Sequence, residues 1–261
     1  MSDFLDEAVL TEFVRNPAAP ATFTDRSPFP WSAFGDLLKP GAFRTLLDAF
    51  PSVELFEMHR GLERAHGQRS HDRFYLAYEQ SIYERADRAP QEGVVGHDAL
   101  PPAWQAFIDE LNSSPAYREF TEKLLGVGPM SARFAWHMGV TGSEVSPHRD
   151  SVDKIGTHIF YFNTADDWQP EWGGSIVVLG GKRIAANNPD MSDFETAVDL
   201  DIRDNRSFLF KNTPDAWHGV EPLTCPSGSY RRLFNVILHP AEGRVAKPRG
   251  FLRRTLQSLR A

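Results

Sequence analysis

Residues 145–163 read VSPHRDSVDKIGTHIFYFN, and they join a polar motif to a predicted strand. The second part, THIFYFN, is rich in β-branched and aromatic residues, which favours a β-strand. The first part holds His148 and Asp150, and no other of the nine histidines has a carboxylate two residues further along. Alternate residues of a strand point to one face, so this pair can present an imidazole and a carboxylate to one metal ion. The alternative is a surface turn in which Asp150 caps a neighbouring backbone group.

A second histidine follows on another β-rich run. The stretch SFLFKNTPDAWHGV, residues 207–220, carries His218 seventy residues after His148. Two histidines and one carboxylate on a β scaffold are the facial ligand set of non-haem Fe(II) oxygenases. Such a set leaves three coordination positions open, of which a bidentate co-substrate can take two and O2 the third. His148, Asp150 and His218 are therefore the candidate metal ligands.

Two arginines open the next predicted strand. Arg231 and Arg232 begin RRLFNVILH, 13 and 14 residues after His218. A guanidinium at the mouth of a barrel can bind a carboxylate through two hydrogen bonds, as the far end of a dicarboxylate such as 2-oxoglutarate would require. The two side chains point to opposite faces of a strand. Arg231 is favoured because its face also carries the polar Asn235, but both remain candidates.

Two patterns divide the chain. The second half consists of short β-rich runs between turn residues, which is typical of an antiparallel sandwich or barrel. The first half is mostly helical, with apolar residues at helical spacing. The predicted strands are 68–78, 132–140, 156–163, 174–180, 206–211 and 231–239. The predicted helices are 3–15, 40–50, 101–112 and 115–125. Ser2 is the expected N-cap of the first helix, and Ser114 and Gly126 are the expected N-cap and C-terminal end of the last. We expect an extended connector at 17–30 and an inserted loop at 181–205.

Taken in order, these pieces resemble the 2-oxoglutarate/Fe(II)-dependent dioxygenases, in the prolyl-hydroxylase-like branch. The resemblance runs from about Phe134 to His239, roughly two fifths of the chain. Its elements are Gly142-x4-Pro147-His148-Arg149-Asp150-Ser151, then THIFYFN, Trp172-Gly173-Gly174, Trp217-His218-Gly219-Val220 and Arg231-Arg232. It implies a double-stranded β-helix, a cupin-like jelly roll.

With this fold we expect a single domain of the α+β class, with a mostly β core and flanking helices. Residues 1–130 would form a mainly helical part that packs on the larger sheet, and residues 131–242 the jelly-roll core. Residues 243–261 are expected to form a basic C-terminal helix, because six basic residues and no acid follow Glu242.

The resemblance assigns a role to each matched position. His148, Asp150 and His218 would bind Fe(II), and Arg231 or Arg232 would bind the far carboxylate of 2-oxoglutarate. Tyr161 stands where this branch often has a tyrosine that helps to hold that carboxylate; the alternative for it is a core aromatic. Because Asp150 is present, hydroxylation is favoured over halogenation, since the related halogenases have a small residue there.

The implied cofactors are Fe(II), 2-oxoglutarate as co-substrate and O2, with ascorbate as a reductant. The implied reaction hydroxylates an aliphatic C–H of an amino acid, a prolyl or peptide substrate or a small biosynthetic molecule, and releases succinate and CO2. One alternative is a non-catalytic sensor that binds a metal or a dicarboxylate on the same fold. A less favoured alternative is a zinc hydrolase, for which Glu144 or Glu221 would have to serve as the general base.

Two features concern the substrate side. Gly139 stands where the family often has a tyrosine, so His137, Trp136 or Met138 would partly replace that side chain. The segment HGQRSHDRFYLAY, residues 66–78, places Arg69, His71 and Arg73 on one face if it forms a strand. These three residues are candidates for substrate binding, and a salt-bridged surface strand is the alternative.

Composition excludes several classes of protein. With 41% hydrophobic and 24% charged residues, the 261-residue chain is typical of a globular protein, and no apolar run reaches the roughly 20 residues of a membrane helix. The net charge of −7 argues against a nucleic-acid partner. A single cysteine, Cys225, excludes an internal disulfide and fits a reducing cytoplasm. The acidic start of the chain is unlike a signal or transit peptide. We therefore expect a cytoplasmic protein with a small-molecule or peptide substrate and no membrane partner.

Overall fold

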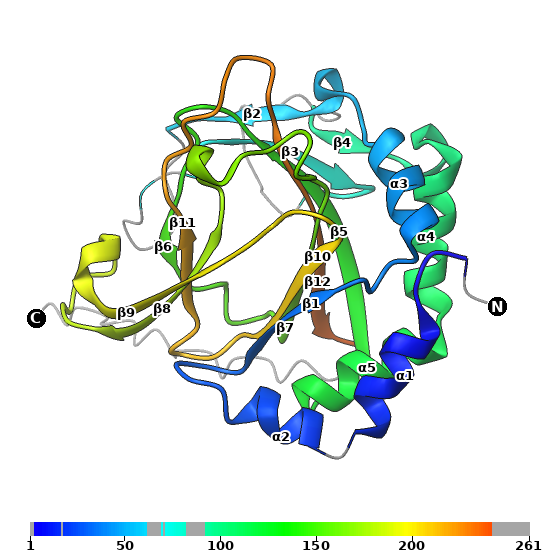
Figure 1. Ribbon diagram of the computed structural model, residues 1–261, viewed down its shortest axis with the longest axis horizontal. Helices are drawn as coiled ribbons and strands as arrows, with labels where there is room; N and C mark the ends of the chain where they lie inside the picture. The colour runs from blue at the N-terminus through cyan, green and yellow to red at the C-terminus, as the bar shows by residue number, and fades with distance from the viewer. Residues whose placement is uncertain (1–2, 17, 62–68, 70, 82–91, 242–261) are drawn as a thin grey trace, which may run out of the picture.

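Two antiparallel sheets face each other, and helices cover the outer side of the larger sheet (Figure 1). The structure is a computed structural model that describes residues 3–16, 18–61, 69, 71–81 and 92–241. The smaller sheet has the order β6-β11-β8-β9, and the larger has the order β1-β10-β7-β12-β5-β3-β2, with β4 paired to β3. This arrangement is the double-stranded β-helix that the sequence predicts.

The strands of the larger sheet are β1 (Trp31–Gly35), β2 (Glu57–His59), β3 (Arg73–Tyr78), β4 (Val94–Val95), β5 (Met130–Gly139), β7 (Gly156–Tyr161), β10 (Arg206–Lys211) and β12 (Arg231–Pro240). Those of the smaller sheet are β6 (Val145–His148), β8 (Ile176–Lys182), β9 (Phe194–Leu200) and β11 (Trp217–Val220). The α-helices of the described residues are α1 (Glu7–Arg15), α2 (Ala18–Thr24), α3 (Pro40–Asp48), α4 (Pro102–Ser113) and α5 (Pro115–Leu125).

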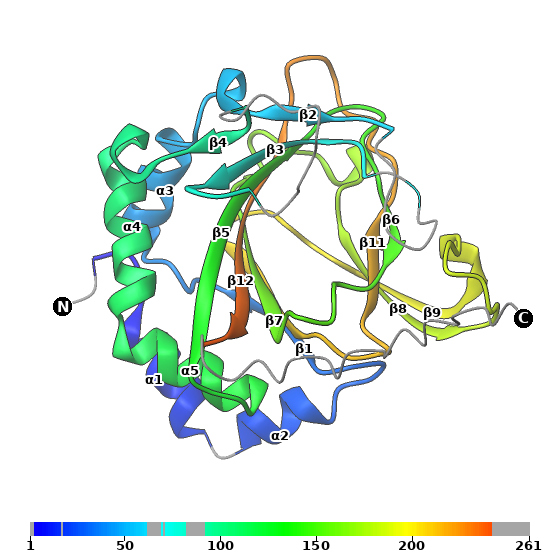
Figure 2. The same cartoon turned by 180° about the vertical axis from the view of Figure 1, so that it is seen from behind.

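Alternation along the central strands separates two cores. Phe134 and Trp136 of β5, Phe160 of β7 and Phe234 of β12 contact the helices in one large aromatic cluster. The alternate residues of the same strands face the smaller sheet, where Ile159, Tyr161 and Leu233 belong to a second cluster. Figure 2 shows the consequence from behind, with helices α1, α4 and α5 on the side of β5 and β12 that faces away from β8 and β9. The cavity described below lies on the inner side.

The predicted elements of the core agree closely with the structure. Each strand predicted between residues 132 and 239 is present, with ends that differ by at most two residues. Helix α5 begins and ends as expected, because the Ser114 side chain accepts from the Tyr117 N–H and Gly126 adopts a left-handed conformation at φ 66°. The strand predicted at 68–78 is shorter, since β3 begins at Arg73.

Three expectations were wrong in detail. Helix α1 is capped by Asp6 rather than Ser2, because the backbone N–H groups of residues 3–5 donate instead to the carboxylate of Glu110. The predicted connector 17–30 contains helix α2, where Pro20 lies in the first turn and removes no internal hydrogen bond. The predicted loop 181–205 contains the edge strand β9, which extends the smaller sheet. The basic tail 243–261 lies outside the described residues.

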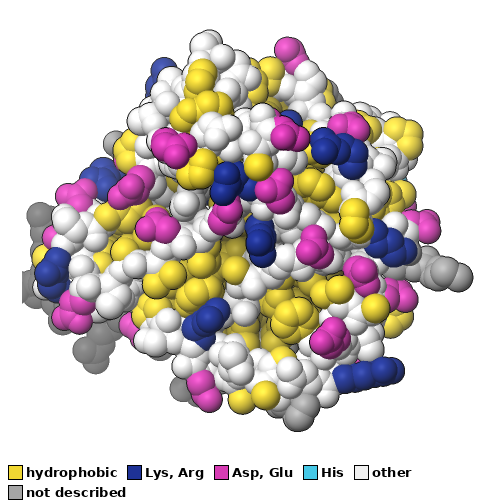
Figure 3. Space-filling view, in the orientation of Figure 1, with side chains coloured by type: hydrophobic (Ala, Val, Ile, Leu, Met, Phe, Trp, Pro, Cys, Tyr) yellow, Lys and Arg dark blue, Asp and Glu magenta, His cyan; other side chains and the backbone are white. Residues whose placement is uncertain are grey.

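No helix among the described residues is long and apolar enough to cross a membrane. On the face drawn in Figure 3, acidic and basic side chains are interspersed, with hydrophobic side chains showing between them.

A buried histidine ties helix α5 to strand β7. His158 is fully buried, and its Nδ1 lies 3.0 Å from the Tyr117 hydroxyl oxygen, with the two rings stacked. Burial lowers the pKa of His158 to about 3 and raises that of Tyr117. The phenol therefore donates to a neutral imidazole.

His158 should make the free energy of unfolding pH-dependent. Its lowered pKa stabilises the folded state fully above pH 6.5, and this contribution is lost as the pH falls toward 3, because only the unfolded chain binds the proton. In a His158→Asn variant, which keeps an acceptor for Tyr117, the loss of unfolding free energy between pH 6.5 and pH 4.5 should be roughly 2 kcal/mol smaller than in the wild type. Urea denaturation at both pH values checks this, and parallel losses in the two proteins would contradict it.

Candidate metal centre

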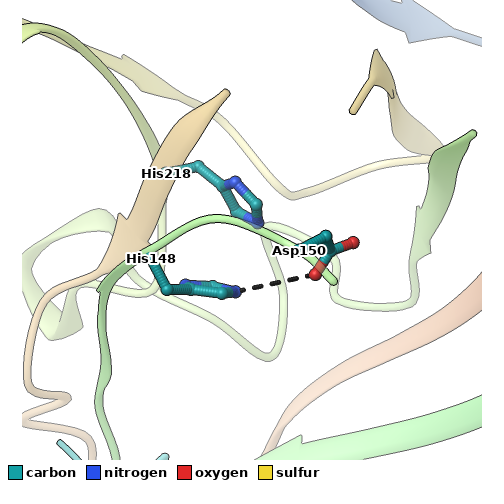
Figure 4. A group of neighbouring side chains, drawn as sticks. All are labelled: His148, Asp150 and His218. Atoms are coloured by element: carbon teal, nitrogen blue, oxygen red, sulfur yellow. Dashed lines mark ion pairs between the residues drawn. The ribbon is translucent and has the colours of Figure 1, made fainter. Parts of the chain in front are cut away.

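The register of two short strands brings the predicted ligands together. Strands β6 and β11 pair antiparallel, with His148 directly opposite His218, and their ring centroids lie 4.3 Å apart. Asp150 follows β6 after one residue and turns back toward both rings (Figure 4). One ligand atom from each of the three side chains lies within 4.8 Å of the others. All three residues line the same cavity between the sheets.

Both imidazoles are oriented in the same way. His148 Nδ1 lies 3.0 Å from the Ser146 carbonyl oxygen, and His218 Nδ1 lies 3.0 Å from the Ala216 carbonyl oxygen. A carbonyl oxygen only accepts, so each Nδ1 carries the proton and donates it. Each Nε2 is then the unprotonated nitrogen, and a neutral imidazole with an unprotonated Nε2 is the form that binds a metal.

Asp150 is held as a carboxylate. Its Oδ2 accepts from the Thr157 hydroxyl at 3.0 Å, and its Oδ1 lies 3.2 Å from Lys154 Nζ. Burial raises the pKa of Asp150, but the Lys154 ammonium lowers it through its charge and its hydrogen bond, and the pKa lies below its usual range. An ionised carboxylate beside two neutral imidazoles is a donor set that fits a divalent metal ion such as Fe(II).

A buried guanidinium lies in the same cavity, which has a volume of about 700 Å3. Arg231 is only 6% exposed, its Nε donates to the Gly174 carbonyl oxygen at 2.6 Å, and its guanidinium lies 5.3 Å from the centre of the Tyr161 ring. Among the described residues, no acidic side chain forms an ion pair with Arg231. Gly174 permits this position, because a Cβ there would lie 3.0 Å from Arg231 Cδ.

Tyr161 offers a second donor beside Arg231. Its hydroxyl is buried beside the Arg231 guanidinium, and it has no acceptor for its own proton within the described part of the chain. Burial raises the pKa of Tyr161 to about 12, so the hydroxyl keeps its proton at neutral pH. A buried cation without a carboxylate and a buried hydroxyl without an acceptor for its proton are both costly unless a ligand satisfies them. Together they fit the carboxylate of a co-substrate.

The structure separates the two arginines. Arg232 points to the opposite face of β12, where its guanidinium forms an ion pair with Asp167 and its backbone N–H donates to Asn163 Oδ1 at 2.7 Å. Arg232 does not line the cavity. The sequence alone leaves Arg232 as a candidate for binding 2-oxoglutarate. In the structure, the alternation of side chains along β12 places Arg232 away from the site.

Of the three candidates for substrate binding, two line the cavity and one does not. His71 and Arg73 line the cavity, with Arg73 Nη1 3.3 Å from His71 Nδ1 and the His71 ring 4.4 Å from the His148 ring. Arg69 is not among the lining residues; it forms an ion pair with Asp190, and its backbone N–H donates to Asn188 Oδ1 at 3.1 Å. It therefore joins its segment to the one between β8 and β9.

Sequence reasoning missed part of the cavity wall. His59, Arg133 and Asn235 line it as well. Arg133, His137 and Gly139 share a face of a predicted strand, so alternation was an available signal for Arg133, whereas the short strand β2 that carries His59 was not predicted. Of the expected replacements for a tyrosine at position 139, His137 and Met138 line the cavity and Trp136 does not. A Cβ at Gly139 would lie 2.7 Å from Leu223 Cδ1, so a tyrosine there would require the Leu223 side chain to move.

Neither glutamate that a zinc hydrolase could use as its general base is available beside the candidate metal ligands. Glu144 lines the cavity, but its carboxylate lies 3.9 Å from the Arg69 guanidinium. Glu221 is exposed and is not a lining residue.

Comparisons with known proteins agree with this geometry. The sequence model of the 2OG-Fe(II) oxygenase superfamily matches residues 132–239. No curated protein sequence matches the chain. Among solved structures of similar fold, the carbocyclase SnoK from nogalamycin biosynthesis, described as non-haem and α-ketoglutarate-dependent, has a TM-score of 0.56 at 15% identity, with 87% of this chain and 86% of that chain covered.

Two further structures share the fold. A prolyl 4-hydroxylase from Phytophthora capsici has a TM-score of 0.54 at 13% identity, with 93% of this chain and 68% of that one covered. HygX from Streptomyces hygroscopicus, solved with nickel and 2-oxoglutarate bound, has a TM-score of 0.52 at 10% identity, with 81% and 83% covered. The matched segment contains β5 to β12 and with them all three candidate ligands. The segment at residues 132–239, about two fifths of the chain, is therefore similar to the 2OG-Fe(II) oxygenase superfamily.

Proposed function

We propose that this protein is an Fe(II)- and 2-oxoglutarate-dependent dioxygenase that hydroxylates an aliphatic C–H bond of an amino acid, a prolyl or peptide substrate or a small biosynthetic molecule. In the reaction, 2-oxoglutarate, O2 and R–H give succinate, CO2 and R–OH. The observation that carries the proposal is one cavity that holds both the His148–Asp150–His218 cluster and a buried arginine without an acidic partner among the described residues.

His148, Asp150 and His218 would hold the metal ion. Bound Fe(II) supplies the redox chemistry of O2 activation, and the protein fixes the geometry around it. The two backbone carbonyl groups keep each imidazole turned with Nε2 inward. Thr157 and Lys154 hold the Asp150 carboxylate ionised beside the imidazoles.

Arg231 and Tyr161 would bind the far carboxylate of 2-oxoglutarate. The guanidinium is anchored through Nε to Gly174, which leaves its two terminal nitrogens to donate to a carboxylate. The Tyr161 hydroxyl adds a neutral donor. The apolar side chains of Ile159, Leu223 and Leu233 line the cavity and exclude water from these bonds, which strengthens them.

Two observations favour this function over the alternatives. A zinc hydrolase needs a general base beside the metal, and Glu144 is engaged by Arg69 while Glu221 lies outside the cavity. A hydrolase also gives no role to Arg231 and Tyr161. A sensor would use the same donors but would not consume 2-oxoglutarate, so turnover separates it from an oxygenase.

Turnover of 2-oxoglutarate tests the proposal. Protein loaded anaerobically with Fe(II) and then exposed to O2, with ascorbate to keep the iron reduced, should form succinate even without the prime substrate, although slowly. The His148→Ala variant should form none above the metal-only background. If the wild type forms no succinate and also shows no visible absorption band dependent on Fe(II) and 2-oxoglutarate, the oxygenase proposal fails.

Metal binding should depend on the three proposed ligands and not on the imidazole next to them. Loss of one of three ligands in His148→Ala or His218→Ala should weaken Co(II) binding by at least about 100-fold, beyond the effect of a residue that only supports a ligand. His71→Ala is the matched control, because His71 contacts the His148 ring without belonging to the cluster. Titration followed by the Co(II) absorption spectrum measures the affinities, and an equal loss in the control would contradict the assignment.

The two adjacent arginines give a matched test of co-substrate binding. Arg231→Gln should raise the Kd of 2-oxoglutarate for the anaerobic Fe(II) protein by at least about tenfold, because it removes hydrogen bonds to a charged group. Arg232→Gln should change this Kd by less than about threefold, since Arg232 faces Asp167 outside the cavity. Titration of the visible band measures both values. The reverse order would assign the co-substrate to Arg232.

A further inference from the structure

Four strands align a row of residues across the larger sheet. His59 on β2 pairs with Arg73 on β3, and Arg231 on β12 pairs with Gly139 on β5. Phe74 pairs with Met138, so continued antiparallel register places Arg73 opposite Gly139. The row therefore reads His59, Arg73, Gly139 and Arg231, all of which line the cavity. It carries two arginines separated by one glycine, and the buried Glu57, which pairs with Tyr75 in the adjacent row, lies 3.4 Å from the His59 imidazole.

The next row adds a buried donor. His137 pairs with Tyr75 on β3 and with Leu233 on β12, and it is 8% exposed. Its Nε2 makes no hydrogen bond within the described residues. Burial and then the charges of Arg73, His59 and Arg231 lower the pKa of His137, so the imidazole is neutral and faces a positively charged surrounding. An unpartnered nitrogen in such a place is costly unless a ligand satisfies it.

His71 completes this side of the cavity next to the metal cluster. Arg73 Nη1 lies 3.3 Å from His71 Nδ1, and because a guanidinium only donates, Nδ1 accepts and Nε2 carries the proton. The His71 ring also contacts the His148 ring. A ligand bound by Arg73 and His71 would therefore lie beside the proposed metal ligands.

Each of the four acidic residues that line the cavity has at least one partner among the described residues. Asp150 belongs to the metal cluster, and Glu144 lies 3.9 Å from the Arg69 guanidinium. Asp153 accepts from Ser151 and lies 3.4 Å from His239 Nδ1, and Asp72 accepts from the Gly61 N–H. Arg73, Arg231 and the imidazoles of His71 and His137 line the same cavity, and their positive charge and hydrogen-bond donors fit an oxyanion.

We infer that Arg73, together with His71 and His137, binds a carboxylate of the prime substrate, so that the substrate is a small carboxylic acid such as a free amino acid or an organic acid. This inference rests on the proposed function. Arg231 and Tyr161 take the co-substrate carboxylate on one side of Gly139, and Arg73 takes the substrate carboxylate on the other. The cavity of about 700 Å3 has to hold both molecules, which favours a small substrate over a folded protein.

The test uses the full chain loaded with Zn(II), which cannot support turnover, and saturated with 2-oxoglutarate. Propionate is the probe, propionamide its neutral counterpart, and ligand-observed NMR measures binding. Propionate should bind and propionamide should not. Arg73→Gln should weaken propionate binding by at least about tenfold. Arg73→Lys keeps the charge but loses the two parallel donors of the guanidinium, so its affinity for propionate should lie between those of the wild type and Arg73→Gln. Arg203→Gln, which removes a cation paired with Asp201, is the control and should bind like the wild type.

The Kd of 2-oxoglutarate, measured in the same Zn(II) protein, shows whether each variant is folded and should change by less than about threefold in Arg73→Gln. Equal binding of propionate and propionamide, or no binding of propionate to a wild type that binds 2-oxoglutarate, would overturn the inference. A parallel loss of 2-oxoglutarate and propionate in Arg73→Gln would also overturn it, because Arg73 would then serve the co-substrate. If the wild type fails to bind 2-oxoglutarate, the proposed function itself fails. A blocked peptide acid, acetyl-Ala-Ala, extends the test. Binding of propionate but not of the peptide would support a small carboxylic acid as substrate. Binding of the peptide but not of propionate would overturn the inference.

Discussion

The antiparallel pairing of β6 with β11 holds His148 opposite His218, and the candidate site depends on this register. A shift of one residue would turn one imidazole to the other face of the sheet, because alternate side chains point to opposite faces. The backbone carbonyl groups of Ser146 and Ala216 then fix both rings in the same tautomer. Asp150 completes the cluster from the loop, where Thr157 of the opposite sheet orients it. The two sheets thus contribute to one group of three donors.

The larger sheet supplies what the metal cluster lacks. Its outer face packs against the helices through aromatic side chains, which leaves its inner face available for polar groups. Arg231 and Tyr161 are buried there at a cost in stability, since neither is fully satisfied by the described protein groups. Proteins retain such groups where a ligand compensates them. The larger sheet therefore holds the proposed donors to the co-substrate, and the smaller sheet holds the two histidines of the candidate metal centre.

Much of this arrangement could be predicted from the sequence, since the spacing of His148, Asp150 and His218 and the β-rich runs around them are local signals. Alternation along β12 favours Arg231, and the structure separates the two arginines because Arg231 lines the cavity while Arg232 forms an ion pair with Asp167. Strand β9 is hard to recognise in the sequence because it is an edge strand whose middle residues are exposed, so its hydrophobic alternation is weak. The row from His59 to Arg231 depends on strand order, which a sequence pattern does not contain.

A crystal structure of the Mn(II) and 2-oxoglutarate complex, grown without O2, tests the central claim most directly. Anomalous diffraction should place one metal ion among His148 Nε2, His218 Nε2 and the Asp150 carboxylate. The far carboxylate of 2-oxoglutarate should lie against the terminal nitrogens of Arg231 and the hydroxyl of Tyr161. A metal ion bound elsewhere, or a co-substrate carboxylate held by other residues, would contradict the account.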